Sequence, residues 1–318
     1  MKKIAFIFPG QGSQYVGMGQ EFYQREAAAK EMFDLASSVT GLDIPGLCFE
    51  QNDELNQTEY TQVAMLATEV ALLRTLEAYG ISSQVNAGLS LGEYAALVAS
   101  GVLEPKDAFA LVRQRGILMQ NAYPVGGAMA AVLGLNGDVI ANVCEETRAQ
   151  KPELGFVGVA NYNCPGQIVI TGAAEAVSAA SEKLVQAGAK RCMPLKVSGP
   201  FHSELLREAG EALGEQIAKA EVHAPKTPYI TNVTADYVTE AQGIPELLQQ
   251  QVYSSVRWQQ SVERMLQDGV THFVEIGPGR TLAGFMKRID TEKKAVVYNV
   301  DAYDNLAAVL EKLKEDAE

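Results

Sequence analysis

The sequence is short of the residues that build disulfide frameworks and metal sites. Its four cysteines stand far apart, at positions 48, 144, 164 and 192, and none forms a Cys-x-x-Cys pair. Such spacing predicts neither a disulfide framework nor a structural zinc site, and it is typical of proteins from a reducing compartment. We therefore expect a cytoplasmic protein that binds no metal.

Long apolar runs and an excess of positive charge are also lacking. No stretch approaches the ~20 apolar residues of a transmembrane helix, and Pro9 ends the first apolar run too early for a signal peptide. With 26 Lys and Arg against 39 Asp and Glu, the net charge is −13, which disfavours binding to nucleic acid or an anionic membrane. We expect neither as a partner, and without a heptad repeat we expect a monomer.

The 318 residues, 47% of them hydrophobic, suffice for a large core and suggest one domain with an insertion or two domains. Residues 1–126 and 199–318 show apolar runs that alternate with helical patterns, which predicts an α/β domain with a mainly parallel sheet. Its predicted strands span residues 3–8, 84–87, 229–233, 272–276 and 295–300. The helices expected around them span about 18–29, 31–39, 61–79, 93–99, 105–121, 204–220, 245–252, 259–268 and 305–314, with one more from 281.

Residues 127–198 have a different pattern. Strands are predicted at 129–133, 155–161, 167–171 and 191–197, with helices at 137–149 and 173–187. The order strand-helix-strand-strand-helix-strand is that of a ferredoxin-like unit. Because the unit is complete in itself, we interpret it as an inserted subdomain, with hinges near residues 126–127 and 198–199.

A glycine-rich turn after the second predicted strand has the spacing of a nucleophile elbow. Residues 88–92 read Gly-Leu-Ser-Leu-Gly and are followed by an alanine-rich helix. Between a strand and a helix, this spacing holds a serine hydroxyl out at the strand end. The pattern predicts an α/β-hydrolase-like domain with Ser90 as the nucleophile and the amide of Leu91 as a donor to an oxyanion. The alternative is a structural turn.

Two further features are candidates for the same site. Gln11 lies in a glycine-rich loop just after the first strand, where open α/β sheets place their ligands, although such a loop can also be only a turn. Arg113 and Arg115 lie two residues apart on the helix 105–121, so at most one can face the site. A solvated surface position is the usual alternative for such an arginine.

A serine nucleophile needs a base, and the chain has only three histidines. His272 begins an apolar strand, and His223 lies in the segment that leads into another strand. These positions favour structural roles for both histidines. His202 follows a Gly-Pro pair at a helix start, and we predict that it is the general base. No acid of the kind found between Ser and His in α/β-hydrolases is evident, so a backbone carbonyl would orient the imidazole in a Ser–His dyad.

Together the motifs resemble those of a known family. They read, in chain order, Gly-Gln-Gly-Ser-Gln at 10–14, Gly-Leu-Ser-Leu-Gly-Glu-Tyr at 88–94, Arg-Gly at 115–116, Asn-Tyr-Asn at 161–163, Pro-Gly-Gln at 165–167, Phe-His-Ser at 201–203, Gln-Val-Tyr at 251–253 and Gly-Pro-Gly at 277–279. This set is similar to that of the malonyl-CoA:acyl carrier protein transacylases of bacterial fatty acid synthesis, which are also the acyltransferase domains of polyketide synthases. The resemblance covers essentially the whole chain.

The resemblance implies a catalytic role for several matched residues. Ser90 would carry the acyl group and His202 would be its base. The main-chain carbonyl of Gln251 would accept a hydrogen bond from His202, in the place of the missing acid. Gln11 and the amide of Leu91 would form the oxyanion hole.

The resemblance also implies substrate contacts. Arg115 would pair with the free carboxylate of a malonyl group, and Asn161 would bind substrate. Phe201 would set the size of the α-substituent that the site accepts. In the family, an aromatic residue before the histidine occurs with malonyl and a smaller residue with methylmalonyl. Many relatives have histidine where this chain has Leu89, so one polar contact near the site is lost.

The implied reaction transfers malonyl from malonyl-CoA to the phosphopantetheine thiol of acyl carrier protein, through a malonyl-serine and without a cofactor. The carrier would serve fatty acid synthesis; the alternative is a trans-acting malonyl acyltransferase of a polyketide synthase. A serine hydrolase would use the same elbow but has no need of Arg115. A noncatalytic scaffold subunit would be free to lose Ser90 or His202.

Overall fold

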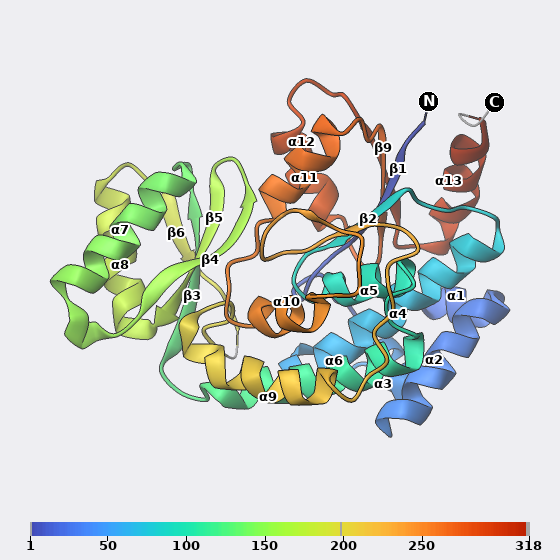
Figure 1. Ribbon diagram of the computed structural model, residues 1–318, viewed down its shortest axis with the longest axis horizontal. Helices are drawn as coiled ribbons and strands as arrows, with labels where there is room; N and C mark the ends of the chain where they lie inside the picture. The colour runs from blue at the N-terminus through green and yellow to red at the C-terminus, as the bar shows by residue number, and fades with distance from the viewer. Residues whose placement is uncertain (1, 198, 316–318) are drawn as a thin grey trace.

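The computed structural model describes residues 2–197 and 199–315, which are arranged around two β-sheets (Figure 1). The larger sheet has six strands in the order β10-β9-β1-β2-β7-β8. All its neighbouring strands are parallel except β7 and β8. The strands are β1 (Ile4–Phe8), β2 (Val85–Gly88), β7 (Tyr229–Ile230), β8 (Tyr237–Val238), β9 (His272–Ile276) and β10 (Val296–Val300).

Helices cover both faces of this sheet, because alternate residues of the central strand β1 are apolar on both sides. Phe6 and Phe8 pack into the core that holds α4 and α5, whereas Ala5 and Ile7 pack against α11 and α12. The helices are α1 (Gln20–Arg25), α2 (Ala27–Thr40), α3 (Ile44–Phe49), α4 (Thr58–Ala78), α5 (Gly92–Ala99), α6 (Pro105–Ala122), α9 (Arg207–Ile217), α10 (Ile244–Gln251), α11 (Trp258–Gln267), α12 (Thr281–Ile289) and α13 (Tyr303–Glu315), with 3-10 turns at Glu54–Asn56 and Glu204–Leu206. We call this assembly the large unit.

The smaller sheet is antiparallel, with the order β4-β5-β3-β6. Its elements are β3 (Gly127–Leu133), α7 (Gly137–Gln150), a 3-10 turn (Pro152–Leu154), β4 (Val157–Cys164), β5 (Gln167–Ala173), α8 (Ala174–Gln186) and β6 (Arg191–Pro194). We call them the small unit, which lies at the left of Figure 1. Helices α7 and α8 cover one face of this sheet, while Met129 and Val169 on the other face pack into the core of the large unit.

The structure corrects several predicted element boundaries. The helix expected at 18–29 is α1, which ends at Arg25 because Glu26 is extended (φ −118°, ψ 116°), and α2 then begins at Ala27. Helix α3 was not predicted; Asp43 caps it by accepting from the Gly46 amide. The strand expected at 191–197 ends at Pro194, and residue 198, the predicted end of the inserted subdomain, lies outside the described residues. No helix in the described ranges is long and apolar enough to cross a membrane.

Candidate active site

The carboxyl ends of four adjacent parallel strands meet at one edge of the large sheet. The register places Phe8 of β1 beside Gly88 of β2, so the loops that follow these strands lie side by side. They bring Gln11 and Ser90 to the same edge, which is where open α/β sheets bind ligands. The loops after β9 and β7 flank them on either side.

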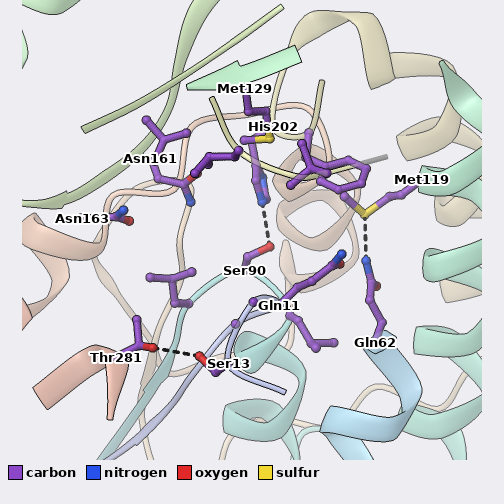
Figure 2. Close-up of a pocket in the computed structure, with 18 of the residues that line it drawn as sticks. Gln11, Ser13, Gln62, Ser90, Met119, Met129, Asn161, Asn163, His202 and Thr281 are labelled. Carbon is purple, nitrogen blue, oxygen red and sulfur yellow. Dashed lines mark hydrogen bonds between the residues drawn. The ribbon is translucent and has the colours of Figure 1, made fainter. Parts of the chain in front are cut away.

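A cavity of about 380 Å³ opens at this edge, against the small unit. Residues of both units line it, as Figure 2 shows, with Ser90 and His202 at its centre. Gln11 and Leu91 come from the large unit, whereas Met129 and Asn161 come from the small one. The cavity therefore receives most of the residues expected from the sequence.

The turn that carries Ser90 is a strained elbow. Ser90 has a φ of 55°, in the left-handed region that residues with a side chain rarely adopt. A Cβ added to Gly88 would lie 2.0 Å from the Gly92 carbonyl, and one added to Gly92 would lie 2.2 Å from the oxygen of Phe8. The two glycines are thus required by close approach of the backbone, and the turn holds the serine hydroxyl at the strand end.

Asn232, from the loop after β7, closes the elbow from the side. Its Oδ1 accepts from the Ser90 amide at 2.6 Å, and its Nδ2 donates to the Gly88 carbonyl at 2.6 Å. These two bonds span the strained turn and stabilise its conformation. The sequence pattern places residue 232 within the predicted strand 229–233, so it gives no signal for this contact.

His202 is held between Ser90 and the main chain of Gln251. Its Nε2 lies 2.7 Å from Ser90 Oγ, and its Nδ1 lies 2.9 Å from the Gln251 carbonyl oxygen. A carbonyl only accepts, so Nδ1 carries the proton and Nε2 is left to accept from the serine hydroxyl. Burial, helped by the Arg115 charge, lowers the pKa of His202 to about 4. The imidazole is therefore an uncharged base at neutral pH.

The other two histidines do not line the cavity. His223 is 40% exposed and lies 3.9 Å from Glu221, while His272 begins β9 with its Nδ1 2.8 Å from Thr271 Oγ1. Neither contacts Ser90.

Of the two arginines on α6, only Arg115 lies beside the serine. It is 0% exposed, and its guanidinium donates to Ser90 Oγ at 3.2 Å, to Gln251 Oε1 at 3.0 Å and to Gln62 Oε1 at 2.7 Å. Arg113 turns away, donates to the Glu59 carbonyl at 2.8 Å and pairs with the Glu59 carboxylate at 3.0 Å. A buried guanidinium next to the nucleophile offers a planar pair of donors to a carboxylate.

Donors for an oxyanion are present where the sequence places them. Leu91 is the N-cap residue of α5, and within the described residues its amide has no hydrogen-bond partner. The main-chain amide of Gln11 also has no hydrogen-bond partner within the described residues, while the Gln11 side chain donates to Thr58 Oγ1 at 3.0 Å. Both residues line the cavity, so both amides are available to a bound carbonyl oxygen.

The remaining predicted residues line the cavity walls. Asn161 on β4 is 8% exposed, and Phe201, just before the histidine, is 6% exposed. Leu89 packs on the first loop, where a Cβ on Gly10 would meet its side chain at 2.8 Å. The leucine therefore fills an apolar contact at the position where many members of the resembled family have histidine.

Three polar residues at the site were not predicted. Gln62 holds Arg115, Asn232 holds the elbow, and the fully buried Glu93 accepts from Gln251 Nε2 at 2.6 Å. Glu93 belongs to the elbow motif, but the sequence pattern indicates only that it begins the predicted helix 93–99. Within the described residues no group of three or more His, Cys, Asp or Glu could hold a metal ion.

Comparisons with known proteins agree on one family. Residues 5–307 match the model of the acyl transferase domain. The chain is 44% identical over 318 residues to the malonyl CoA-acyl carrier protein transacylase of Bacillus subtilis, covering 99% of each chain. The crystal structure of the corresponding transacylase from Clostridium perfringens superposes with a TM-score of 0.93 at 39% identity, over 99% of this chain and 98% of that one.

A second similar structure is a malonyl-transacylase in complex with a type II polyketide synthase acyl-carrier protein. It has a TM-score of 0.93 and 38% identity, over 98% of this chain and 100% of the other. Each match spans nearly the full length of both compared chains and agrees with the motifs found in the sequence. The chain therefore belongs to the acyl transferase domain family and, within it, to the malonyl CoA-acyl carrier protein transacylases.

Proposed function

We propose that this enzyme transfers the malonyl group of malonyl-CoA to the phosphopantetheine thiol of acyl carrier protein, for fatty acid synthesis. The observation that carries the proposal is the buried Arg115 guanidinium 3.2 Å from the Ser90 hydroxyl. An acyl group on Ser90 that ends in a carboxylate would place that charge within reach of Arg115. The relatives' names supply the substrate and the carrier.

In the first half-reaction Ser90 attacks the thioester carbonyl and its proton passes to His202 Nε2. The amides of Leu91 and Gln11 stabilise the oxyanion of the tetrahedral intermediate, and His202 returns the proton to the departing CoA thiolate. The Gln251 carbonyl holds the imidazole in the required tautomer. In the second half-reaction the carrier's thiol attacks malonyl-Ser90 by the same steps in reverse order.

Arg115 is proposed to exclude acetyl groups. Acetyl-Ser90 would leave the buried guanidinium without an anionic partner, and such polar mismatches can change selectivity by about 10⁴-fold. Phe201 is proposed to limit size at the malonyl α-carbon, because a methyl group there would crowd a buried ring. Exchange of Phe201 for Ser should then raise transfer of methylmalonyl relative to malonyl, and an unchanged ratio would count against this role.

The finer description of the fold is also a proposal. The large unit, residues 1–126 and 199–318, is α/β-hydrolase-like because its elbow follows a central parallel strand. The small unit, residues 127–198, is ferredoxin-like because a strand-helix-strand-strand-helix-strand chain forms an antiparallel sheet. We further propose a cytoplasmic monomer that needs no cofactor, which sedimentation of the purified enzyme and its activity after exhaustive dialysis would test.

The acceptor of the malonyl group distinguishes this function from hydrolysis by the same Ser–His dyad: a transferase passes the group to the carrier thiol, and a hydrolase passes it to water. The enzyme should move labelled malonyl from malonyl-CoA to holo-acyl carrier protein far faster than it releases malonate. The Ser90→Ala variant serves as the control for uncatalysed transfer. Release of malonate at the same rate with and without the carrier would contradict the proposal and favour a hydrolase. A carrier from a polyketide synthase used in preference to one from fatty acid synthesis would favour the alternative role.

A further inference from the structure

A fully buried carboxylate lies beneath the cavity and has no part in the proposed transfer. Glu93 stands in the first turn of α5 and is 0% exposed. Its Oε2 accepts from Gln251 Nε2 at 2.6 Å and from the Asn232 amide at 3.2 Å. Within the described residues its Oε1 has no donor at hydrogen-bond distance, and the Thr231 hydroxyl is the further donor that acts on the carboxylate. A buried carboxylate with so few donors is costly unless a positive charge lies near.

Arg115 has the complementary need. Its three acceptors, Gln62 Oε1, Gln251 Oε1 and Ser90 Oγ, are all uncharged. Within the described residues Arg115 forms no salt bridge, and the acidic groups that act on it electrostatically are the Tyr94 hydroxyl and the Glu93 carboxylate. The guanidinium stays charged although burial lowers the pKa of Arg115.

The side-chain amide of Gln251 lies between these two charges. Its oxygen accepts from Arg115 at 3.0 Å, and its nitrogen donates to Glu93 at 2.6 Å and to the Ser90 carbonyl at 2.8 Å. The negative end of the amide dipole therefore faces the guanidinium and the positive end faces the carboxylate. Both charges orient the same amide, and the amide fixes the distance between them.

Resting on the proposed binding of a malonyl carboxylate to Arg115, we propose that Glu93 is the resident counter-charge of Arg115, held one amide away, and that it limits how tightly the site binds a carboxylate-bearing acyl group. In the empty site Glu93 balances the guanidinium. A bound malonyl carboxylate adds a second anion near the same cation, and its repulsion by Glu93 subtracts from affinity. Glu93 touches no substrate, so it is a positioning residue that acts through Gln251 and Arg115.

Such a limit suits a transfer enzyme. Binding that is equally strong for the substrate and the transition state lowers KM without raising kcat. Without an internal counter-charge, the guanidinium would bind the carboxylate of malonyl-CoA and of malonyl-Ser90 as strongly as it binds the carboxylate in the transition state. The counter-charge keeps the guanidinium in place for selection while it weakens the ground-state complex.

The other titratable groups around Glu93 keep their charge near neutral pH. Tyr94, on the same helix, and Tyr229, on β7, have pKa values raised by burial, to about 12 for Tyr94. The pKa of His202 is lowered to about 4, and Arg115 remains charged. Burial raises the pKa of Glu93 to about 7, so among these groups only Glu93 changes its charge between about pH 6 and pH 8.5.

Glu93→Gln tests the proposal because it removes the charge and retains an oxygen that accepts from both donors. Binding of malonyl-CoA and acetyl-CoA would be measured by calorimetry at about pH 8.5, in a Ser90→Ala background that prevents acyl transfer. We expect Glu93→Gln to raise the affinity for malonyl-CoA about tenfold relative to acetyl-CoA. An unchanged or lower ratio would overturn the proposal, and equal weakening of both ligands would show a purely structural role.

A second measurement leaves Glu93 in place and so does not depend on the folding of that variant. The Ser90→Ala protein itself should bind malonyl-CoA more tightly relative to acetyl-CoA at about pH 6 than at about pH 8.5, because Glu93 takes up a proton. The CoA phosphates titrate alike in both ligands and cancel in the ratio. A ratio that is the same at both pH values would contradict the proposal.

Glu69→Gln is the matched control. Glu69 on α4 is also 0% exposed, and burial raises its pKa well above the ordinary value, but its oxygens have no hydrogen bond to Gln251. This variant should leave the ratio unchanged. Arg115→Ala distinguishes an error in the proposed role of Glu93 from an error in the proposed role of Arg115. If Arg115→Ala lowers the ratio while Glu93→Gln does not change it, only the role of Glu93 is wrong. If Arg115→Ala leaves the ratio unchanged, the proposed role of Arg115 is wrong as well.

Discussion

At the scale of single residues, substrate choice is assigned to one of two neighbouring arginines. Arg115→Ala should lose malonyl transfer and gain acetyl transfer, because the cavity no longer contains a buried cation that requires a carboxylate. Rates with malonyl-CoA and acetyl-CoA measure the change. Arg113→Ala is the matched control and should keep the selectivity, since Arg113 is occupied by Glu59. Equal loss of malonyl transfer in both variants would contradict the assignment.

His202 should act as a base well below neutral pH. Burial lowers its pKa to about 4 from the ordinary 6.5, and a base works only when it is unprotonated. Activity is therefore lost only as the pH falls through the lowered value. Rapid-quench rates of Ser90 malonylation should stay nearly constant from about pH 7 to pH 5 and decline below that range. A midpoint near pH 6.5 would show that the imidazole is not desolvated in the working enzyme.

At the scale of elements, the elbow depends on glycine for space. Gly92→Ala would place a Cβ 2.2 Å from the Phe8 oxygen and 2.5 Å from that of Pro9, so the start of α5 must move away from β1. We expect a loss of roughly 3 kcal/mol or more in the free energy of unfolding. Gly284→Ala is the control on α12: it has open space around it and should stabilise by about 1 kcal/mol. Urea denaturation measures both, and a neutral Gly92→Ala would contradict the packing argument.

Elements with a clear period could be predicted from the sequence, and their boundaries were close. Strand β9 was predicted at its observed bounds, and α6 was predicted one residue short. The break between α1 and α2 was placed too late, because Glu26 is a good helix former whose extended conformation depends on tertiary contacts. Strand β7 is three residues shorter than predicted, because Asn232 leaves the sheet to hold the elbow.

The candidate site could be predicted where local motifs specify it. Ser90, His202 and Arg115 stand in turns or on helices with recognisable neighbours, and the structure places them in contact. Glu93 and Gln62 could not be predicted as polar partners, because each lies on a helix of good helix formers and meets its partner from a distant segment. Such contacts depend on how α4, α5 and α10 pack, which no local pattern encodes.

At the scale of the whole molecule, the net charge constrains how a carrier can dock. Both this chain, at −13, and a typical acyl carrier protein are acidic, so docking needs a local basic patch near the cavity. Lys190, Arg191 and Lys196 are exposed on or beside β6, next to Leu195, which lines the cavity. They form the candidate patch; solvated edge charges with no partner are the alternative.

Reversal of Lys190 and Arg191 to Glu should raise the KM for the carrier protein, most clearly at low ionic strength, because such charges steer association and are screened by salt. Malonylation of Ser90 by malonyl-CoA should barely change. The same reversal at Lys312 and Lys314, exposed on α13 far from the small unit in Figure 1, controls for net charge. If the reversal at Lys190 and Arg191 slows malonylation of Ser90 and transfer to the carrier protein equally, or slows neither, the carrier docks elsewhere.

The proposed transfer requires that Ser90 carry a malonyl group between the two thiols, and the mass of the intact protein shows whether it does. After brief incubation with malonyl-CoA, the enzyme should gain the mass of one malonyl group, and addition of holo-acyl carrier protein should remove it. Ser90→Ala should show no adduct, because the nucleophile beside His202 is gone. An adduct that persists in Ser90→Ala, for example on Cys164, would show that another residue accepts the malonyl group and that Ser90 is not its carrier.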